Sequence, residues 1–160
     1  MSKPYDFISA VEGQDYQFTT QSGDKYTAWF TEFFLQTQDQ NELLIYSFGF
    51  ECSRNSTESS LRFDTRIKAT IQNIIIEFFK KHPNDAILYI CSSADGKARN
   101  RHITFSNWFN EFGNNFTKCD SQIQYEGNDF YSSIIILNDN PQKDYLIDAF
   151  FFTIEYWMGE

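Results

Sequence analysis

The sequence predicts an α+β fold: a mostly antiparallel, twisted sheet of about seven strands with three helices, in the order β-β-β-β-α-β-α-β-β-α. Apolar residues alternate with a period of two in the first third of the chain, and a helical stripe of Ile and Phe follows. Aromatic residues make up 19% of the 160 residues. Because a chain of this length buries roughly 70% of its unfolded surface, we expect a single domain, residues 1–160, with a core rich in rings.

The first third of the chain is expected to form four antiparallel strands. Apolar residues alternate on both sides of turn residues at 12–15, and a second turn at 22–24 leads into a longer strand, 26–35. A polar turn at 36–41 separates this strand from the next one, 42–52. Together these segments predict a meander.

The first helix follows a polar loop at 53–60. Asp64 is a suitable N-cap, Lys80 and Lys81 place cations in the last turn, and Pro83 stops the helix. The apolar residues between these ends share one helical face: Ile67, Ile71, Ile74, Ile75 and Phe78.

The middle of the chain predicts a buried strand and a second helix. Residues 86–91 are continuously apolar, as in a central strand, and the preceding helix permits parallel pairing through a crossover. A polar turn at 92–96 leads into a helix that Gly113 ends. The apolar stripe of this helix consists of Ala98, Phe105, Trp108, Phe109 and Phe112.

The last part predicts a hairpin and a third helix. Strands at 117–125 and 130–137 flank a turn at 126–129, and Asn140-Pro141 caps the helix. Its inward residues are expected to be Leu146, Ile147, Phe150, Phe151, Ile154 and Trp157.

No signal sequence and no membrane-spanning segment can be recognised, so a cytoplasmic location is expected. Cys52, Cys91 and Cys119 are odd in number and widely spaced, which predicts ordinary thiols rather than disulfides. They do not form a metal-binding cluster with His82 and His102, and neither histidine has a nucleophile at a diagnostic spacing. We therefore predict no catalytic residue, no metal and no cofactor.

Charge is unevenly distributed along the chain. The net charge is −9, yet residues 54–101 hold nine basic and five acidic residues and carry +4, which leaves −13 on the flanks. Such a protein repels nucleic acid and anionic membranes, and it favours a basic protein partner. Solubility alone is the alternative explanation. The residues favour no particular oligomeric state.

Two groups of basic residues are candidates for ligand or partner binding. One lies at the start of the first helix and the other at the start of the second, where free N–H groups bind anions. The alternative to anion binding is that these basic residues form salt bridges to Asp95 and to the acidic flanks. Arg101 lies on the apolar stripe of the second helix, so it could instead pair with a buried carboxylate or stack on an aromatic ring. The candidates are Arg62, Arg66, Lys68, Asp95, Lys97, Arg99, Arg101 and His102.

Two resemblances follow from these elements. The element order over 42–137 resembles the GCN5-related N-acetyltransferase fold, which implies coenzyme A binding, although residues 62–69 lack the glycines of that family's pyrophosphate loop. The motif D-x-R-I-x-x-T-I-x-x-I-I-x-x-F-F-x-x-H-P at 64–83, followed by Y-I-C and D-G-K-x-x-R-x-R-x-x-F-x-x-W-F, is similar to a small uncharacterised bacterial family of unknown function. That second resemblance covers Asp64–Phe109 and implies no activity.

The sequence thus favours a non-enzymatic acidic interaction protein, such as an antitoxin-like or immunity-like accessory module. The alternative is an acyl-CoA-dependent N-acyltransferase-like enzyme or another phosphate-ligand-binding enzyme, which would use coenzyme A or a related anion. The missing glycines favour binding over transfer.

Overall fold

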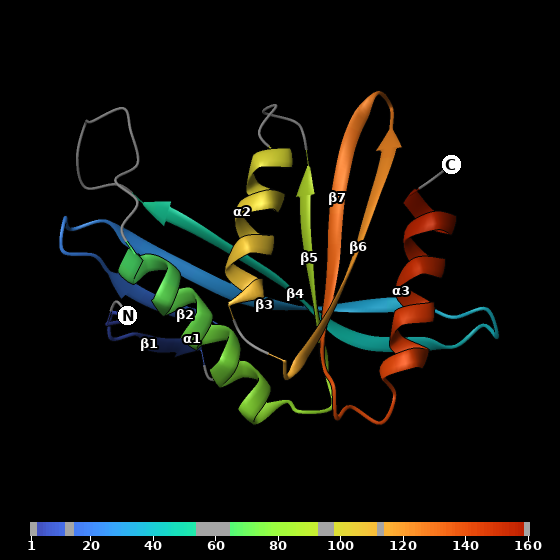
Figure 1. The fold of residues 1–160 in the computed structure, drawn as a ribbon, viewed down its shortest axis with the longest axis horizontal. Helices are drawn as coiled ribbons and strands as arrows, with labels where there is room; N and C mark the ends of the chain where they lie inside the picture. Colours follow the sequence, from blue (N-terminus) through green and yellow to red (C-terminus); the bar gives the residue numbers. More distant parts are fainter. Residues whose placement is uncertain (1–2, 12–14, 54–64, 93–97, 112–113, 159–160) are drawn as a thin grey trace. The chain divides into compact units, whose positions relative to one another are not determined.

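The computed structural model of the protein describes residues 3–11, 15–53, 65–92, 98–111 and 114–158. Within these residues, strands and helices follow one another in the predicted order (Figure 1). The elements are β1 (Ile8–Val11), β2 (Asp15–Thr19), β3 (Lys25–Gln36), β4 (Glu42–Ser53), α1 (Thr65–Lys81), β5 (Ala86–Ser92), α2 (Ala98–Asn110), β6 (Phe116–Tyr125), β7 (Asn128–Leu137) and α3 (Lys143–Met158).

The sheet confirms the predicted α+β class. Its strand order is β1-β2-β3-β4-β5-β7-β6. Neighbours are antiparallel in β1–β2, β2–β3, β5–β7 and β6–β7, whereas β4 and β5 are parallel, with Tyr46 opposite Ile87. The parallel pair is the predicted crossover, because α1 connects the two strands.

The chain divides into two compact units. Unit 1 comprises residues 1–31 and 48–81, and unit 2 comprises residues 32–47 and 82–160. Strands β3 and β4 run through both units. The single-domain assignment therefore stays a prediction, and the two units are described separately.

Unit 1 has an aromatic core under α1. The Ile and Phe residues of the predicted stripe are buried, and Phe78 stacks on Phe30 of β3 with ring centres 4.4 Å apart. Tyr16 of β2 packs edge-on against Phe30 at 5.9 Å. The ring-rich core expected from the composition is thus confirmed in this unit.

Unit 2 has an aliphatic core under α3. Leu146 and Phe150 of α3 pack with Leu88 of β5 and with Ile134 and Ile136 of β7, and all five are buried. Asn140 caps α3 as predicted, since its Oδ1 accepts the Gln142 N–H at 2.8 Å. None of the helices in the described part of the chain is long and apolar enough to cross a membrane.

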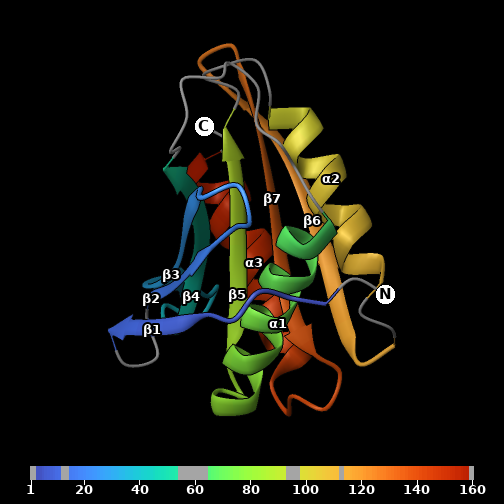
Figure 2. The same cartoon turned by 90° about the vertical axis from the view of Figure 1, so that its left-hand side faces the viewer.

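Helix α2 covers the other face of the same strands in unit 2, as the turned view in Figure 2 also shows. Leu88 of β5 faces α3, whereas the next residue, Tyr89, stacks on Phe105 of α2 with ring centres 4.0 Å apart. Successive side chains of a strand point to opposite faces, so β5 and β7 are covered on both sides. This confirms the prediction of a buried central strand at 86–91.

Some predicted details differ or lie outside the described residues. The β6–β7 connection is a two-residue turn of Glu126 and Gly127, not a four-residue turn at 126–129. Both residues have positive φ, 52° and 80°, which matches the tight turn that the twist of a hairpin favours. The predicted features at Asp64, 54–60, 93–96 and Gly113 lie outside the described part of the chain.

Candidate functional site

The predicted binding residues Arg66 and Lys68 lie in the first turns of α1, in unit 1, where both are half-buried. Arg66 is engaged within its own chain. Its Nε donates to the Lys3 carbonyl oxygen at 2.8 Å, and its guanidinium lies 3.8 Å from the centre of the Tyr5 ring. These contacts hold the N-terminal segment against α1.

The other predicted residues are not described to the level of their side chains. Arg62, Asp95 and Lys97 lie outside the described residues. The backbone of Arg99, Arg101 and His102 belongs to α2, in unit 2, and their side chains lie outside the described part. An anion-binding patch made by these groups therefore stays a prediction.

Helix α3 presents two adjacent stripes to solvent. With 3.6 residues per turn, the carboxylates of Asp144, Asp148 and Glu155 fall within about 40° of one another around the helix axis, and all three residues are exposed. Three rings lie beside them in a second stripe. We call the two stripes together the acidic-aromatic face: Asp144, Asp148, Glu155, Tyr145, Phe152 and Tyr156.

Two of the three rings of this face stack on each other. Phe152 and Tyr156 stack with ring centres 5.4 Å apart and planes at 10°. Tyr156 is 58% exposed and Tyr145 is 38% exposed, which is unusual for large side chains in a protein that buries most of its rings. The stacked pair therefore offers a preformed aromatic surface next to the carboxylates.

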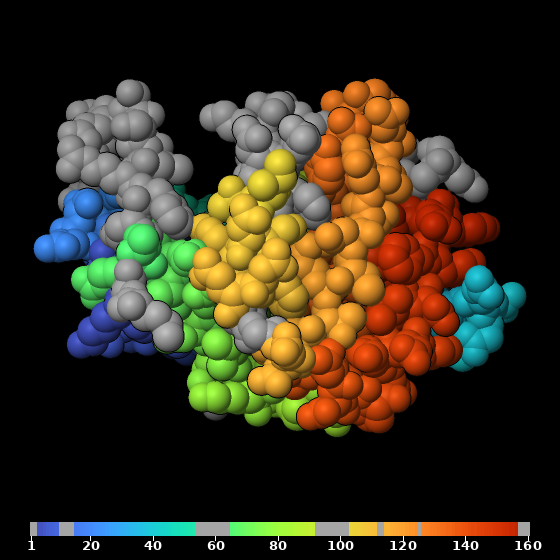
Figure 3. Space-filling model, in the orientation of Figure 1, coloured from blue at the N-terminus to red at the C-terminus, as the bar shows by residue number. Residues whose placement is uncertain are grey.

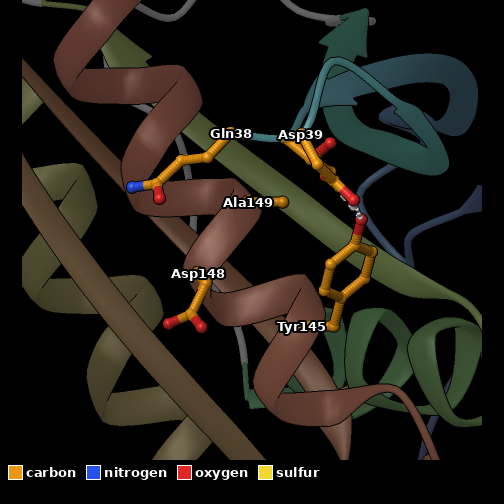
Figure 4. A pocket seen from close by; sticks show the side chains of 6 residues that line it. Gln38, Asp39, Tyr145, Asp148 and Ala149 are labelled. Carbon is orange, nitrogen blue, oxygen red and sulfur yellow. Dashed lines mark hydrogen bonds between the residues drawn. The ribbon is translucent and has the colours of Figure 1, made fainter.

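A turn at residues 37–41 borders the acidic-aromatic face (Figure 3, cyan beside the red α3). The Tyr145 hydroxyl donates to both carboxylate oxygens of Asp39, at 2.9 and 3.2 Å (Figure 4). Asn41 donates to Asp39 from its side chain at 3.1 Å, and its own N–H donates to Thr37 Oγ1 at 2.9 Å. These bonds fix the turn next to α3.

Hydrogen bonds favour the ionised form of Asp39. The Thr37 hydroxyl, followed by Tyr145, holds the pKa of Asp39 below its ordinary value. A pocket of about 270 Å³ lies between the turn and α3, with Asp39 and Asp148 among its lining residues. The pocket thus adds a fourth carboxylate to the three on the helix.

Two hydrogen bonds join the end of strand β3 to α3. The Gln36 N–H donates to Thr153 Oγ1 at 2.8 Å, and the Thr153 hydroxyl donates back to the Gln36 carbonyl at 3.2 Å. Thr153 is buried, so this pair satisfies backbone groups that the strand would otherwise leave without a partner. These bonds therefore fix α3, and with it the acidic-aromatic face, to strand β3.

Like charges on one helix face reduce helix stability. Asp144 and Asp148 are four residues apart, a spacing at which equal charges cost about 0.2–0.5 kcal/mol. Lys143 is the only basic residue of α3. A surface that gathers carboxylates in this way and leaves rings exposed beside them is suited to receive cations from outside the chain.

The outward stripes of α3 are absent from the sequence-based prediction, which used the inward stripe alone. Their positions can be read from a helical wheel, so this part of the surface could have been predicted from the sequence. The contact between Asp39 and Tyr145 was not, because 106 residues separate them.

The fold and this surface define a class of protein: an α+β protein with a helix that presents carboxylates and rings to solvent. A family model described as a family of unknown function, DUF6169, matches residues 63–151. Because the match covers more than half of the chain, the protein belongs to this family, which confirms the resemblance to a family of unknown function seen in the motif at 64–109.

A search of curated proteins and a search of solved structures find no match. The likeness of the element order to the N-acetyltransferase fold stays a prediction. Among the described residues, no group of three or more His, Cys, Asp or Glu side chains could hold a metal ion.

Proposed function

We propose that the protein is a non-enzymatic interaction module that binds a basic protein partner through the acidic-aromatic face. The observation that carries this proposal is the pair of adjacent stripes on α3, with three carboxylates in one and three rings in the other. Such a surface fits the accessory role, antitoxin-like or immunity-like, that the acidic flanks of the sequence favour.

Lys and Arg side chains of a partner would gain from both stripes. A guanidinium over an exposed ring contributes about 0.5–1 kcal/mol, and an exposed ion pair contributes about 0.2–1 kcal/mol. Several such contacts on one face mainly increase the specificity and the rate of association, and they increase the affinity less. Nucleic acid fits poorly here, because its phosphates would meet the carboxylates.

The test uses two variants with equal changes in net charge. The face variant neutralises the three carboxylates of the stripe, and the control variant neutralises three exposed carboxylates elsewhere. The substitutions are Asp144→Asn, Asp148→Asn and Glu155→Gln in the face variant, and Asp6→Asn, Glu51→Gln and Glu126→Gln in the control variant.

Affinity capture from the native host would be followed by calorimetry with the purified partner at two salt concentrations. We expect a basic partner that the wild type and the control variant retain and the face variant loses, with binding that weakens as salt rises. Equal binding by both variants, an acidic partner, or no retained protein would contradict the proposal. Equal binding would indicate that net charge alone attracts the partner.

A further inference from the structure

A second hollow in unit 2 is unrelated to the acidic-aromatic face. It has a volume of about 410 Å³ and lies between the C-terminal half of α2 and the strand β6. Asp120 contributes to its wall. The other lining residues are Ser106, Phe109, Asn110, Asn114, Phe116 and Lys118.

Lys118 lies in the wall of this hollow with 8% of its side chain exposed. Its Nζ donates to Ser106 Oγ of α2 at 3.0 Å, and it also contacts Asp120. Asp120 in turn accepts a hydrogen bond from the fully buried Ser133 hydroxyl at 2.6 Å. The result is a fixed network that joins α2, β6 and β7.

The alternation of β6 explains why these groups meet. Lys118 and Asp120 are two residues apart and therefore share the strand face toward α2, whereas Cys119 and Ile123 pack against the core under α3. Asp120 lies directly opposite Ser133 in the β6–β7 register. The strand thus places a cation and an anion side by side under a helix.

Lys118 is 8% exposed but Asp120 is 47% exposed, so solvent screens this ion pair and it is weak evidence for stability. One structural explanation is that β6 is an edge strand, where an inward charge discourages pairing with another chain. That explanation accounts for Lys118 alone. It does not account for the hollow beside the lysine, or for the polar groups on the opposite wall.

Each of those polar groups can donate a hydrogen bond to a ligand, and the side chains of Asn110 and Asn114 are exposed. Within the described part of the chain, the carboxamides of Asn110 and Asn114 have no hydrogen-bond partner, and Ser106 accepts from Lys118 but donates to no group. An ammonium has three N–H groups, and two of them are engaged at Lys118. The free donors include one N–H on a charged group, which forms the strongest bonds to oxyanions.

We propose that this hollow binds a small organic carboxylate, whose oxygens take the free donors of Lys118, Ser106 and the two carboxamides. The rings of Phe109 and Phe116, with centres 5.9 Å apart, would contact the apolar part of the ligand. Asp120 offsets the lysine charge, so a singly charged carboxylate fits better than a phosphate of higher charge.

The same contacts favour binding over catalysis. A serine nucleophile needs a neighbouring base that takes its proton. Here the lysine donates to Ser106 and to a carboxylate, so the Ser106 hydroxyl receives a hydrogen bond and is not activated. The site is therefore a receptor for a ligand.

The test is an NMR titration of the ¹⁵N-labelled protein with benzoate, at constant ionic strength. Benzamide has the same shape without charge, and inorganic phosphate supplies oxyanions without a ring. We expect saturable shifts of amides in β6 and α2 with benzoate in the millimolar range, and much weaker shifts with benzamide and with phosphate. Equal shifts from benzoate and benzamide, stronger binding of phosphate, or no saturable shift with benzoate would overturn the proposal.

Two substitutions are expected to act in opposite directions. Lys118→Met should weaken benzoate binding about tenfold or more, because a charge-assisted bond is lost, whereas Lys80→Met removes an exposed lysine of α1 and should have no effect. Asp120→Asn keeps an acceptor for Lys118 and Ser133 but leaves the ammonium charge without its counterion, so benzoate should bind several-fold more tightly. If Lys118→Met does not fold, the Asp120→Asn result still decides: unchanged or weaker binding would refute the proposal.

Discussion

Replacement of Tyr16 by Phe is expected to stabilise the protein. Tyr16 is 2% exposed, and its ring packs edge-on against Phe7 and Phe30, with centres 5.7 and 5.9 Å away. The hydroxyl is buried and has no hydrogen-bond partner in the described part of the chain. Tyr16→Phe keeps the ring and removes only this oxygen.

The magnitude follows from the lost hydration of that hydroxyl. A buried polar group without a partner costs about 1–3 kcal/mol, and part of this gain is offset because the oxygen also fills space. We therefore expect the free energy of unfolding to rise by about 1 kcal/mol, which corresponds to about 2–4 °C in Tm for a chain of this size. Thermal and urea unfolding followed by circular dichroism would measure both quantities.

The difference should grow at alkaline pH. Burial, and secondly the charge of Glu77, raise the pKa of Tyr16 above its ordinary value of 10.0. Below this value both folded and unfolded states keep the proton, so stability does not depend on this group. As the pH rises above 10.0, the unfolded state ionises first and the fold loses stability. Tyr16→Phe removes that loss.

Tyr5→Phe is the matched control with the opposite expected sign. The Tyr5 hydroxyl accepts the Gln21 N–H at 3.1 Å, so its removal leaves a backbone donor without this acceptor and should lower stability by about 1 kcal/mol. If Tyr16→Phe is as destabilising as Tyr5→Phe, the Tyr16 hydroxyl has a partner in solution and the reasoning fails.

Three further predictions concern packing, hydrogen bonding and thiol reactivity. Gly49→Ala should lower stability by about 1–3 kcal/mol in denaturant unfolding, because its Cβ would lie 2.7 Å from Cζ2 of Trp29; an unchanged midpoint would show that the indole moves aside. Thr153→Val should cost about 1–3 kcal/mol by leaving the Gln36 backbone without its side-chain partner, whereas Thr153→Ser should retain most of the stability; equal losses would rule out the hydrogen bond as the cause. Cys119 should react with iodoacetamide more slowly in the native protein than after denaturation at the same pH, since burial, followed by the adjacent carboxylate, raises the pKa of its thiol above 9.0; a native rate equal to the denatured rate would contradict this.

The order of strands and helices was predictable because each element carries its own periodicity. The α1 stripe is the strongest example, since every Ile in it is buried as its spacing requires. Turn geometry was harder, because Glu126 adopts a positive φ that its side chain does not favour. The division into two units depends on contacts between distant segments, for which the local pattern holds no information.

The candidate site was predictable only where it follows from a helix surface. A helical wheel places the α3 stripes, but the partner of a basic residue depends on the tertiary fold. Arg66 illustrates this: its ring contact is with Tyr5, 61 residues earlier in the chain. Lys118 gives no signal in the sequence either, since its burial results from the packing of α2 over β6 and β7.

The two proposed sites lie on opposite faces of the sheet in unit 2: one is on α3, and the other lies between α2 and β6. Every residue that lines the hollow between α2 and β6 falls within 63–151, the part of the chain that the family model spans. The acidic-aromatic face extends beyond it, because Phe152, Glu155 and Tyr156 follow residue 151. The residues proposed to bind the carboxylate therefore all lie within the matched region. The partner surface on α3 depends in part on residues outside that region, so a fragment that ends at residue 151 would lose the stacked rings.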